Sequence, residues 1–391
     1  MNLFNYLMNK NDKEIVDNNH LLEYLLNAGK LTSISGTELN ITAKKTIINE
    51  LIMTKESTQD GTPSPDYPQE VKTVKGYRNL LDLTTTLIPN RTNKGITTTI
   101  NDNQTLSFVG IANSSDNKRY FTSDDNDKIL CKAGTYRILS NYSETVKLEI
   151  RKIISNTRSD VVDVFTSDED FYIYNGIFTL TNNKNYNETI WLQLTEGNQA
   201  LPYVPYGNNY IAVNISDGTD TNYYTIPLNN NEIVGIGNYK DELIVDKNGK
   251  CWLNKKIGKV ILNGSENWAM LDSTIPFKLA INNLLLPRSN NAVPSVLSDY
   301  YKVVAWNTFS TAGDYFLSVT STESNLRIRN NNITTLIDFK TWLSTHNVTV
   351  YYALVTSELI DLNYTADIRL FNGINNISNS DDMTMALKYY S

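Results

Sequence analysis

Cysteine and histidine are nearly absent from the sequence. Its 391 residues include two cysteines, Cys131 and Cys251, and two histidines, His20 and His346. Disulfide-built scaffolds and structural zinc sites need clustered cysteines or histidines, and Ser-His or Cys-His catalysis needs a histidine beside the nucleophile. The sequence therefore argues against all of these classes and allows at most one isolated disulfide.

Long apolar runs and an excess of positive charge are missing too. No segment approaches the roughly 20 apolar residues of a membrane-spanning helix, and residues 1–10 lack the basic start and apolar run of a signal peptide. We therefore expect synthesis in the cytoplasm, no export by the usual route and no membrane insertion. The net charge of −7 argues against a nucleic-acid partner, because such partners are bound by neutralising their phosphates.

The motifs of common enzyme classes are also absent. The chain has no phosphate loop, dinucleotide fingerprint, nucleophile elbow or zinc-protease motif. We therefore expect no enzymatic activity and no cofactor. A glycosidase needs only a pair of carboxylates, so it stays open as an alternative.

What the sequence does contain is a long series of short, alternating apolar segments, which predicts a mainly β fold. The length predicts two or three domains, and we place β domains at 76–206 and 207–391. Many short strands separated by turns favour a β-sandwich for the first of them. Its candidate strands are 96–101, 104–111, 134–141, 145–153, 161–165, 171–180 and 189–195.

The second β domain carries three local signals. Asn248 followed by Gly249 predicts a hairpin with a type I′ turn. The spacing of Phe339, Trp342 and Leu343 predicts one short helix over 336–346. Alternation in residues 383–390 predicts a final strand.

The N-terminal region, residues 1–54, combines a predicted helix with predicted strands. Leu21, Leu22, Leu25 and Leu26 form one helical stripe, and alternation predicts strands within 31–54. A short helix is marginal alone, so the stripe would bury either against a neighbouring subunit or against the chain's own body.

Residues 55–75 separate this region from the β domains. Pro63, Pro65 and Pro68 each fix φ and remove a backbone donor, so neither a helix nor a central strand can run through them. We predict a stiff, extended connector with a strand on each side. Under this division, deletion of residues 1–54 is expected to leave the β domains folded.

Three phrases carry a resemblance to a known family. They are Ser-Thr-Gln-Asp-Gly-Thr-Pro-Ser-Pro-Asp-Tyr-Pro-Gln-Glu-Val at 57–71, Leu-Pro-Tyr-Val-Pro-Tyr-Gly at 201–207, and Lys-Val-Ile-Leu-Asn-Gly-Ser-Glu-Asn-Trp at 259–268. They resemble phrases of tail-tip and baseplate proteins of phages that infect low-GC Gram-positive bacteria. The phrase at 201–207 is similar to the closing strand of carbohydrate-binding-like sandwiches in such proteins.

The resemblance implies a fold, a location and partners. It implies a jelly-roll-like sandwich at 76–206, in a protein of the virion, attached through its N-terminal region to other tail or baseplate proteins. It also implies a homotrimer and recognition of host cell-wall polysaccharide. A purely structural baseplate subunit and a tail-associated glycoside hydrolase are the alternatives.

Aromatic side chains are the candidate binding residues, because flat rings stack on sugar faces while polar neighbours fix the orientation. Tyr120 and Tyr186 lie in turn-rich sequence, so we expect their rings to be exposed. Trp191 lies opposite the apolar face of its strand. These three are the carbohydrate-binding candidates, and each could instead fill the core. Alternation also places Tyr172 and Tyr174 on one side of a strand.

Acidic clusters are the candidates for metal binding or hydrolysis. Predicted loops contain two of them: Asp124, Asp125 and Asp127, and then Asp168, Glu169 and Asp170. Clustered oxygens in sandwich loops suit Ca²⁺, for which the first cluster is the candidate, although neither cluster has EF-hand spacing. Either cluster could also be merely solvated or, in a glycosidase, catalytic.

Overall fold

The computed structural model describes residues 33–43, 50–86, 91–115, 118–119, 129–270, 277–280, 296–304, 315–319, 325–330 and 332–388. The described chain is built almost entirely from β-strands arranged in several sheets, which confirms the predicted mainly β fold. The helix predicted in residues 1–30 lies outside the described residues.

The chain divides into two compact units. We call Gly76–Val213 with Tyr223–Asn231 the sandwich unit, and Met1–Lys75 with Asn214–Asn222 and Glu232–Ser391 the terminal unit. Strands β18 (Tyr210–Ser216) and β19 (Thr221–Pro227) each run through a division between the units.

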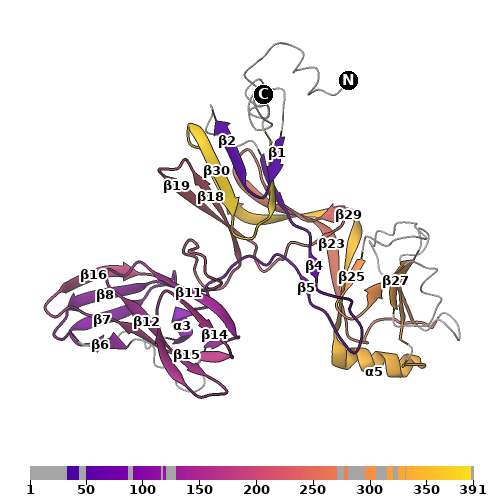
Figure 1. The fold of residues 1–391 in the computed structure, drawn as a ribbon, viewed down its shortest axis with the longest axis horizontal. Helices are drawn as coiled ribbons and strands as arrows, with labels where there is room; N and C mark the ends of the chain where they lie inside the picture. The colour runs from indigo at the N-terminus through magenta and orange to yellow at the C-terminus, as the bar shows by residue number, and fades with distance from the viewer. Residues whose placement is uncertain are drawn as a thin grey trace, which may run out of the picture. The chain divides into compact units, whose positions relative to one another are not determined.

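The sandwich unit contains one helical turn and most of the strands of the first half of the chain (Figure 1). The elements are α3 Leu83–Thr86, β6 Arg91–Asn93, β7 Ile96–Ile100, β8 Leu106–Ile111, β9 Lys118–Arg119, β10 Ile129–Cys131, β11 Gly134–Ser140, β12 Val146–Lys152, β13 Arg158–Val161, β14 Val164–Ser167, β15 Phe171–Phe178, β16 Asn185–Ile190 and β17 Leu192–Glu196. One sheet has the order β10-β15-β12-β13, with β9 also paired to β15. The others have the orders β14-β11-β17 and β16-β8-β7-β6.

The core of the sandwich unit lies between these sheets. Phe108 of β8, Tyr136 of β11, Leu148 of β12 and Phe178 of β15 all belong to one buried cluster. Phe108 and Tyr136 are inward residues of strands in which burial alternates, and burying one face of each sheet forms the core. This arrangement confirms the predicted sandwich.

Most of the predicted strands of this unit are present, but two contain a break. The segment 161–165 spans the end of β13 and the start of β14, because Asp163 adopts a left-handed φ of 50° between them. The segment 189–195 is divided at Trp191, where β16 ends and β17 begins. The two breaks let single runs of sequence contribute to two different sheets.

The terminal unit contains strands from both ends of the sequence. Its elements are β1 Ser33–Gly36, β2 Leu39–Ala43, β3 Glu50–Thr54, β4 Thr58–Gln59, β5 Val71–Lys72, β20 Gly235–Ile236, β21 Tyr239–Lys240, β22 Glu242–Val245, β23 Lys250–Leu262, β24 Phe277–Ala280, β25 Val296–Ser298, β26 Lys302–Val303, β27 Tyr315–Val319, β28 Asn325–Arg329, α5 Leu336–His346, β29 Val348–Thr365, β30 Gly373–Asn379 and β31 Thr384–Lys388. The largest sheet has the order β1-β31-β3-β22-β23-β29-β25. Strand β31 confirms the predicted final strand.

N-terminal and C-terminal strands alternate within this sheet. Strand β3 lies between β31 and β22, and β1 pairs with the other edge of β31. Figure 1 shows the same mixing in a second sheet, where the indigo β2 lies beside the yellow β30. This differs from the predicted division, in which residues 1–54 and 207–391 form separate regions. In the pairs β1–β31, β3–β31 and β2–β30 the partners lie more than 300 residues apart, so no local pattern indicates them.

The proline-rich segment is not an extended spacer. Strands do precede and follow it, as predicted, but β4 and β5 pair with each other in antiparallel fashion. Ser64 and Tyr67 exchange two backbone hydrogen bonds of 3.1 and 3.0 Å, and the Gln69 N–H donates to the Asp299 carbonyl at 2.7 Å. Gly61, with φ of 76°, provides the left-handed residue for the reversal. The segment therefore folds back onto the terminal unit.

Helix α5 spans Leu336–His346, which confirms the predicted helix. Thr335 caps its N-terminus by accepting a hydrogen bond from the Asp338 N–H, and Asn347 ends it in a left-handed conformation. Phe339 and Leu343 are its buried residues. The apolar spacing and the capping residues lie within the helix or next to it, which is why its bounds could be predicted.

The hairpin at Asp246–Lys250 has a different turn from the predicted type I′. Gly249 has a φ of 80°, whereas Asn248 is not in the left-handed region. The Gly249 N–H donates to the Asp246 carbonyl at 2.8 Å, and Asp246 Oδ1 accepts from the N–H groups of Asn248 and Lys250. The Asp246 side chain thereby favours a type I turn followed by a left-handed glycine.

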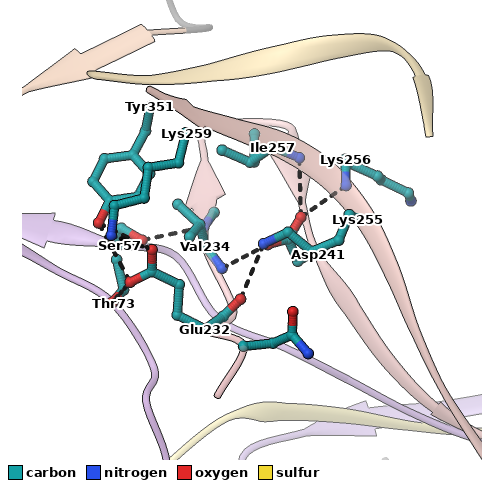
Figure 2. A network of polar contacts seen from close by, with 12 residues as sticks. Ser57, Thr73, Glu232, Val234, Asp241, Lys255, Lys256, Ile257, Lys259 and Tyr351 are labelled. Carbon is teal, nitrogen blue, oxygen red and sulfur yellow. Dashed lines mark hydrogen bonds and ion pairs between the residues drawn. The ribbon is translucent and has the colours of Figure 1, made fainter. Parts of the chain in front are cut away.

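A buried polar network fixes the middle of β23 (Figure 2). The pairing of β23 with β29 shifts between Lys255 and Ile257, and such a bulge leaves backbone groups without ladder partners. Asp241, which is fully buried, accepts from the N–H groups of Lys256 and Ile257 through Oδ1 and from the Val234 N–H through Oδ2. The Lys255 ammonium pairs with the same carboxylate.

A second carboxylate in Figure 2 is equally well satisfied. Glu232 accepts from the Thr73 hydroxyl at 2.8 Å, the Lys259 ammonium at 2.8 Å and the Tyr351 hydroxyl at 3.2 Å. Burial alone would raise the pKa of Glu232, but these hydrogen bonds outweigh burial and hold the pKa below its ordinary value. We assign the network a structural role, because its donors and acceptors satisfy one another.

Candidate functional site

The outward face of strand β15 combines aromatic and charged side chains. Burial alternates along the strand, so that Phe171 and Ile173 are buried while Tyr172 and Tyr174 are half-buried. Both tyrosines therefore lie on the side away from the core, as the sequence predicts. We define the tyrosine face as Tyr172, Tyr174, Asn175, Glu149 and Arg158.

A β-bulge sets the geometry of the tyrosine face. In the pairing of β12 with β15, Glu149 faces Asn175, whereas the next residue, Ile150, faces Ile173. Tyr174 is the extra residue of this bulge. Bulges re-aim side chains and increase local twist, and here the bulge brings an aromatic ring and an amide to adjacent positions opposite Glu149.

The charged groups of the face form a connected set. The Arg158 guanidinium lies 4.4 Å from the centre of the Tyr174 ring, and its Nη1 is 3.5 Å from Glu149 Oε1. Asn175 Nδ2 donates to Glu149 Oε2 at 2.5 Å. The Glu149 side chain is only 8 % exposed, whereas that of Arg158 is 49 % exposed. A buried carboxylate thus positions an exposed guanidinium stacked on a ring.

Such an arrangement can recognise a polar ligand with an apolar face. Guanidinium donors are available at the surface, and half-buried rings beside them offer flat apolar area. Sequence reasoning identified the two tyrosines but missed Glu149, Asn175 and Arg158. Glu149 and Arg158 reach the face through the pairing of β12 with β15 and of β13 with β12, for which the sequence carries no local signal. Asn175 follows Tyr174 in β15 and joins the face at the bulge.

Tyr186 is buried, so the expected exposure of its ring is wrong. It is 0 % exposed and lies 5.4 Å from Phe108 in edge contact. Its hydroxyl donates to Glu144 at 2.6 Å and accepts from the Thr181 N–H at 2.8 Å. The polar residues around it are the outward half of strand β16 rather than a turn. A ring in this position does not reach a glycan.

Trp191 lies at the bend between β16 and β17 and is half-buried. Its ring stacks on that of Tyr203, with 4.9 Å between centroids and 23° between planes. The bend is held by Asn141, whose side chain accepts from the Trp191 N–H at 2.8 Å and donates to the Thr189 carbonyl at 2.9 Å. This contact between Trp191 and Tyr203 was not predicted from the sequence.

Tyr203 belongs to the phrase at 201–207, which resembled a closing strand. The structure has no strand there. Instead, the Gln193 side chain donates to the Pro202 carbonyl at 3.2 Å and accepts from the Val204 N–H at 2.7 Å. An amide side chain replaces ladder pairing because Pro202 and Pro205 have no N–H to donate.

Several candidate residues lie outside the described residues. They are Tyr120 and the calcium candidates Asp124, Asp125 and Asp127. In the part of the chain that the structure describes, no group of three or more metal-ligating side chains comes together.

The second acidic cluster, Asp168, Glu169 and Asp170, contacts two other segments of the chain, 132–133 and 152–154. Asp168 pairs with Lys152, and Asp170 pairs with Lys132 at 2.9 Å and accepts from the Ala133 N–H at 2.9 Å. Glu169 accepts from the Ile154 N–H at 2.7 Å. Hydrogen bonds from the lysines lower the pKa of both aspartates, whereas a glycosidase acid needs a raised pKa. The contacts favour a structural role.

Glu144 provides a pH-dependent prediction. Burial alone raises its pKa, but hydrogen bonds from Tyr186, Lys184 and Thr181 outweigh burial and lower it below the ordinary 4.5. A lowered pKa means that the carboxylate stabilises the fold above about pH 4.5 and loses this effect as the pH falls through the folded-state pKa. We expect the urea midpoint of Glu144→Gln to lie below that of the wild type at pH 7 and to converge with it in acid. A difference that grows in acid would contradict this.

Comparison with known proteins gives no relative. No family model, curated protein or solved structure matches the chain. Within the described ranges, no helix has both the length and the apolar character needed to cross a membrane.

Proposed function

We propose that this protein is a structural component of a phage tail tip or baseplate, and that its sandwich unit recognises glycans on the host cell surface. The resemblance of the phrases at 57–71, 201–207 and 259–268 supports the location. The mainly β architecture with a sandwich supports the class of protein. Attachment to other tail proteins through the N-terminal region and assembly as a homotrimer belong to the same proposal.

The tyrosine face carries the proposal for glycan binding. Sugars present hydroxyls around a ring with apolar C–H faces, so they suit rings beside fixed donors and acceptors. Arg158 supplies exposed donors, and its stacking on Tyr174 at 4.4 Å holds them in place. The buried Glu149 fixes Arg158 from the other side. This preorganisation reduces the entropy that binding would otherwise lose.

We expect Tyr174→Ala to weaken binding to host cell-wall polysaccharide about tenfold, or roughly 1.4 kcal/mol. The substitution removes the ring and frees the guanidinium that stacks on it. The measurement is equilibrium binding of the full chain to polysaccharides from a panel of low-GC Gram-positive bacteria. The same incubations, assayed for new reducing ends, test for a hydrolase.

Tyr223→Ala is the matched control, because Tyr223 is 57 % exposed in the sandwich unit and lies outside the tyrosine face. It should bind like the wild type. If the wild-type protein binds none of the polysaccharides in the panel, the result would favour the purely structural subunit. Equal binding by Tyr174→Ala and Tyr223→Ala would reject the tyrosine face as the site.

A further inference from the structure

A cleft of about 340 Å³ lies elsewhere in the sandwich unit. It is formed by β11, by the start of β12 and by the corner between β13 and β14. Its lining includes Ser140, Tyr142, Glu144, Val146, Val162 and Asp163. The volume falls at the lower end of the range for small-molecule sites, roughly 300–1,000 Å³.

One part of the lining is apolar. Tyr142 and Val146 belong to the buried core and show only their outer edges. Val162 is 44 % exposed and directly precedes the left-handed Asp163 at the corner between β13 and β14. This part can contact the C–H face of a ring-shaped ligand.

The polar part of the lining offers mainly acceptors. Every hydrogen bond that the described residues donate to the Glu144 side chain goes to Oε1, from Tyr186, Lys184 and Thr181. Glu144 is 18 % exposed and lines the cleft, so its carboxylate keeps acceptor capacity. The Asp163 side chain is 67 % exposed and pairs with Arg137 at 3.1 Å.

Two hydroxyls of the cleft already donate within the fold. Ser140 Oγ donates to the Trp191 carbonyl at 2.9 Å, and the Tyr142 hydroxyl donates to the Thr179 carbonyl at 2.7 Å. Ser140 Oγ also accepts from the Tyr142 N–H at 3.1 Å, which leaves it one further acceptor position. A ligand must therefore donate hydrogen bonds. Lys184 and Arg137 already pair with Glu144 and Asp163, so an anionic ligand would have to displace a carboxylate to reach a cation.

From this geometry we propose that the cleft binds one ring of a neutral sugar through its hydroxyl donors, and that it excludes phosphorylated or carboxylated sugars. This inference rests on the proposed glycan recognition and adds a second subsite that selects for charge. Together with the tyrosine face, it would let the sandwich unit distinguish neutral wall polysaccharides from phosphate-rich ones.

The test is saturation-transfer NMR on the full chain with single methyl glycosides, neutral ones against sugar phosphates. We expect transfer to neutral glycosides and none to the phosphates. Val162→Trp fills the cleft and should abolish the transfer, whereas Val164→Trp, also at an exposed valine but outside the lining, should preserve it. Asp163→Asn should let sugar phosphates bind at least tenfold better than they bind to the wild type.

The outcomes separate the two proposals. Unchanged transfer in Val162→Trp, or stronger binding of phosphates than of neutral sugars by the wild type, would overturn the cleft. If Tyr174→Ala still weakens polysaccharide binding in that case, the proposed function stands without the cleft. If Val162→Trp is unfolded, Asp163→Asn decides the question, and an unchanged preference in that variant overturns the inference.

Discussion

Replacing Asp241 by alanine is expected to lower the free energy of unfolding by about 3–5 kcal/mol, the usual cost of breaking a buried ion pair. The change leaves three backbone N–H groups without their acceptor and removes the carboxylate partner of the Lys255 ammonium, which keeps its hydrogen bond to the Glu232 carbonyl at 3.0 Å. Lys255 is 16 % exposed, so water replaces the carboxylate only in part. The cost combines a buried unpaired charge with unsatisfied backbone donors.

Urea denaturation followed by tryptophan fluorescence measures this effect. Four of the five tryptophans, Trp252, Trp268, Trp306 and Trp342, belong to the terminal unit, so the signal reports mainly on that unit. Lys255→Met should cost less, because Asp241 then keeps its three N–H donors. Asp60→Ala, which breaks an exposed pair with Lys72, should leave the midpoint unchanged. A loss for Asp241→Ala as small as that for Asp60→Ala would show that the bulge does not need its acceptor.

Deletion of residues 1–54 is expected to prevent the terminal unit from folding, contrary to the expectation from the sequence. The deletion removes β3 from between β31 and β22, together with Leu51 and Met53, which are both 0 % exposed. Because β1 and β2 are lost as well, three strands, β22, β30 and β31, lose ladder partners, and the apolar residues beneath them become exposed. A chain lacking only residues 1–32 keeps every strand that the structure describes.

Thermal melting and limited proteolysis of the two truncated chains distinguish these cases. The chain lacking 1–32 should melt like the full chain and give the same protected fragments. The chain lacking 1–54 should retain protection only in residues of the sandwich unit. If it instead shows the full-length melting profile, the pairing of β3 is dispensable and the N-terminal region is a separate module.

Elements that depend on neighbouring residues were predicted correctly from the sequence. The pairing between strands was not. Helix α5 was predicted to its bounds because its apolar spacing and its cap lie within a dozen residues. Tyr186 was misplaced because the polar residues between Asn185 and Thr189 indicate a turn as readily as the outer half of an alternating strand. The tyrosine face was found only in part, since Arg158 and Glu149 join it through pairing between strands.

The mixing of early and late strands in one sheet has a consequence for the order of events during synthesis. The sandwich unit is complete once Asn231 has left the ribosome, whereas β3 must wait for β31, which ends at Lys388. Domains fold as units while the chain grows, and contacts between distant residues form slowly. We therefore expect the sandwich unit to fold first, while β1 and β2 stay unpaired, and β3 can pair with β22 alone, until the last strands emerge. During that interval the nascent chain exposes apolar edge strands and depends on chaperones or rapid completion to escape aggregation.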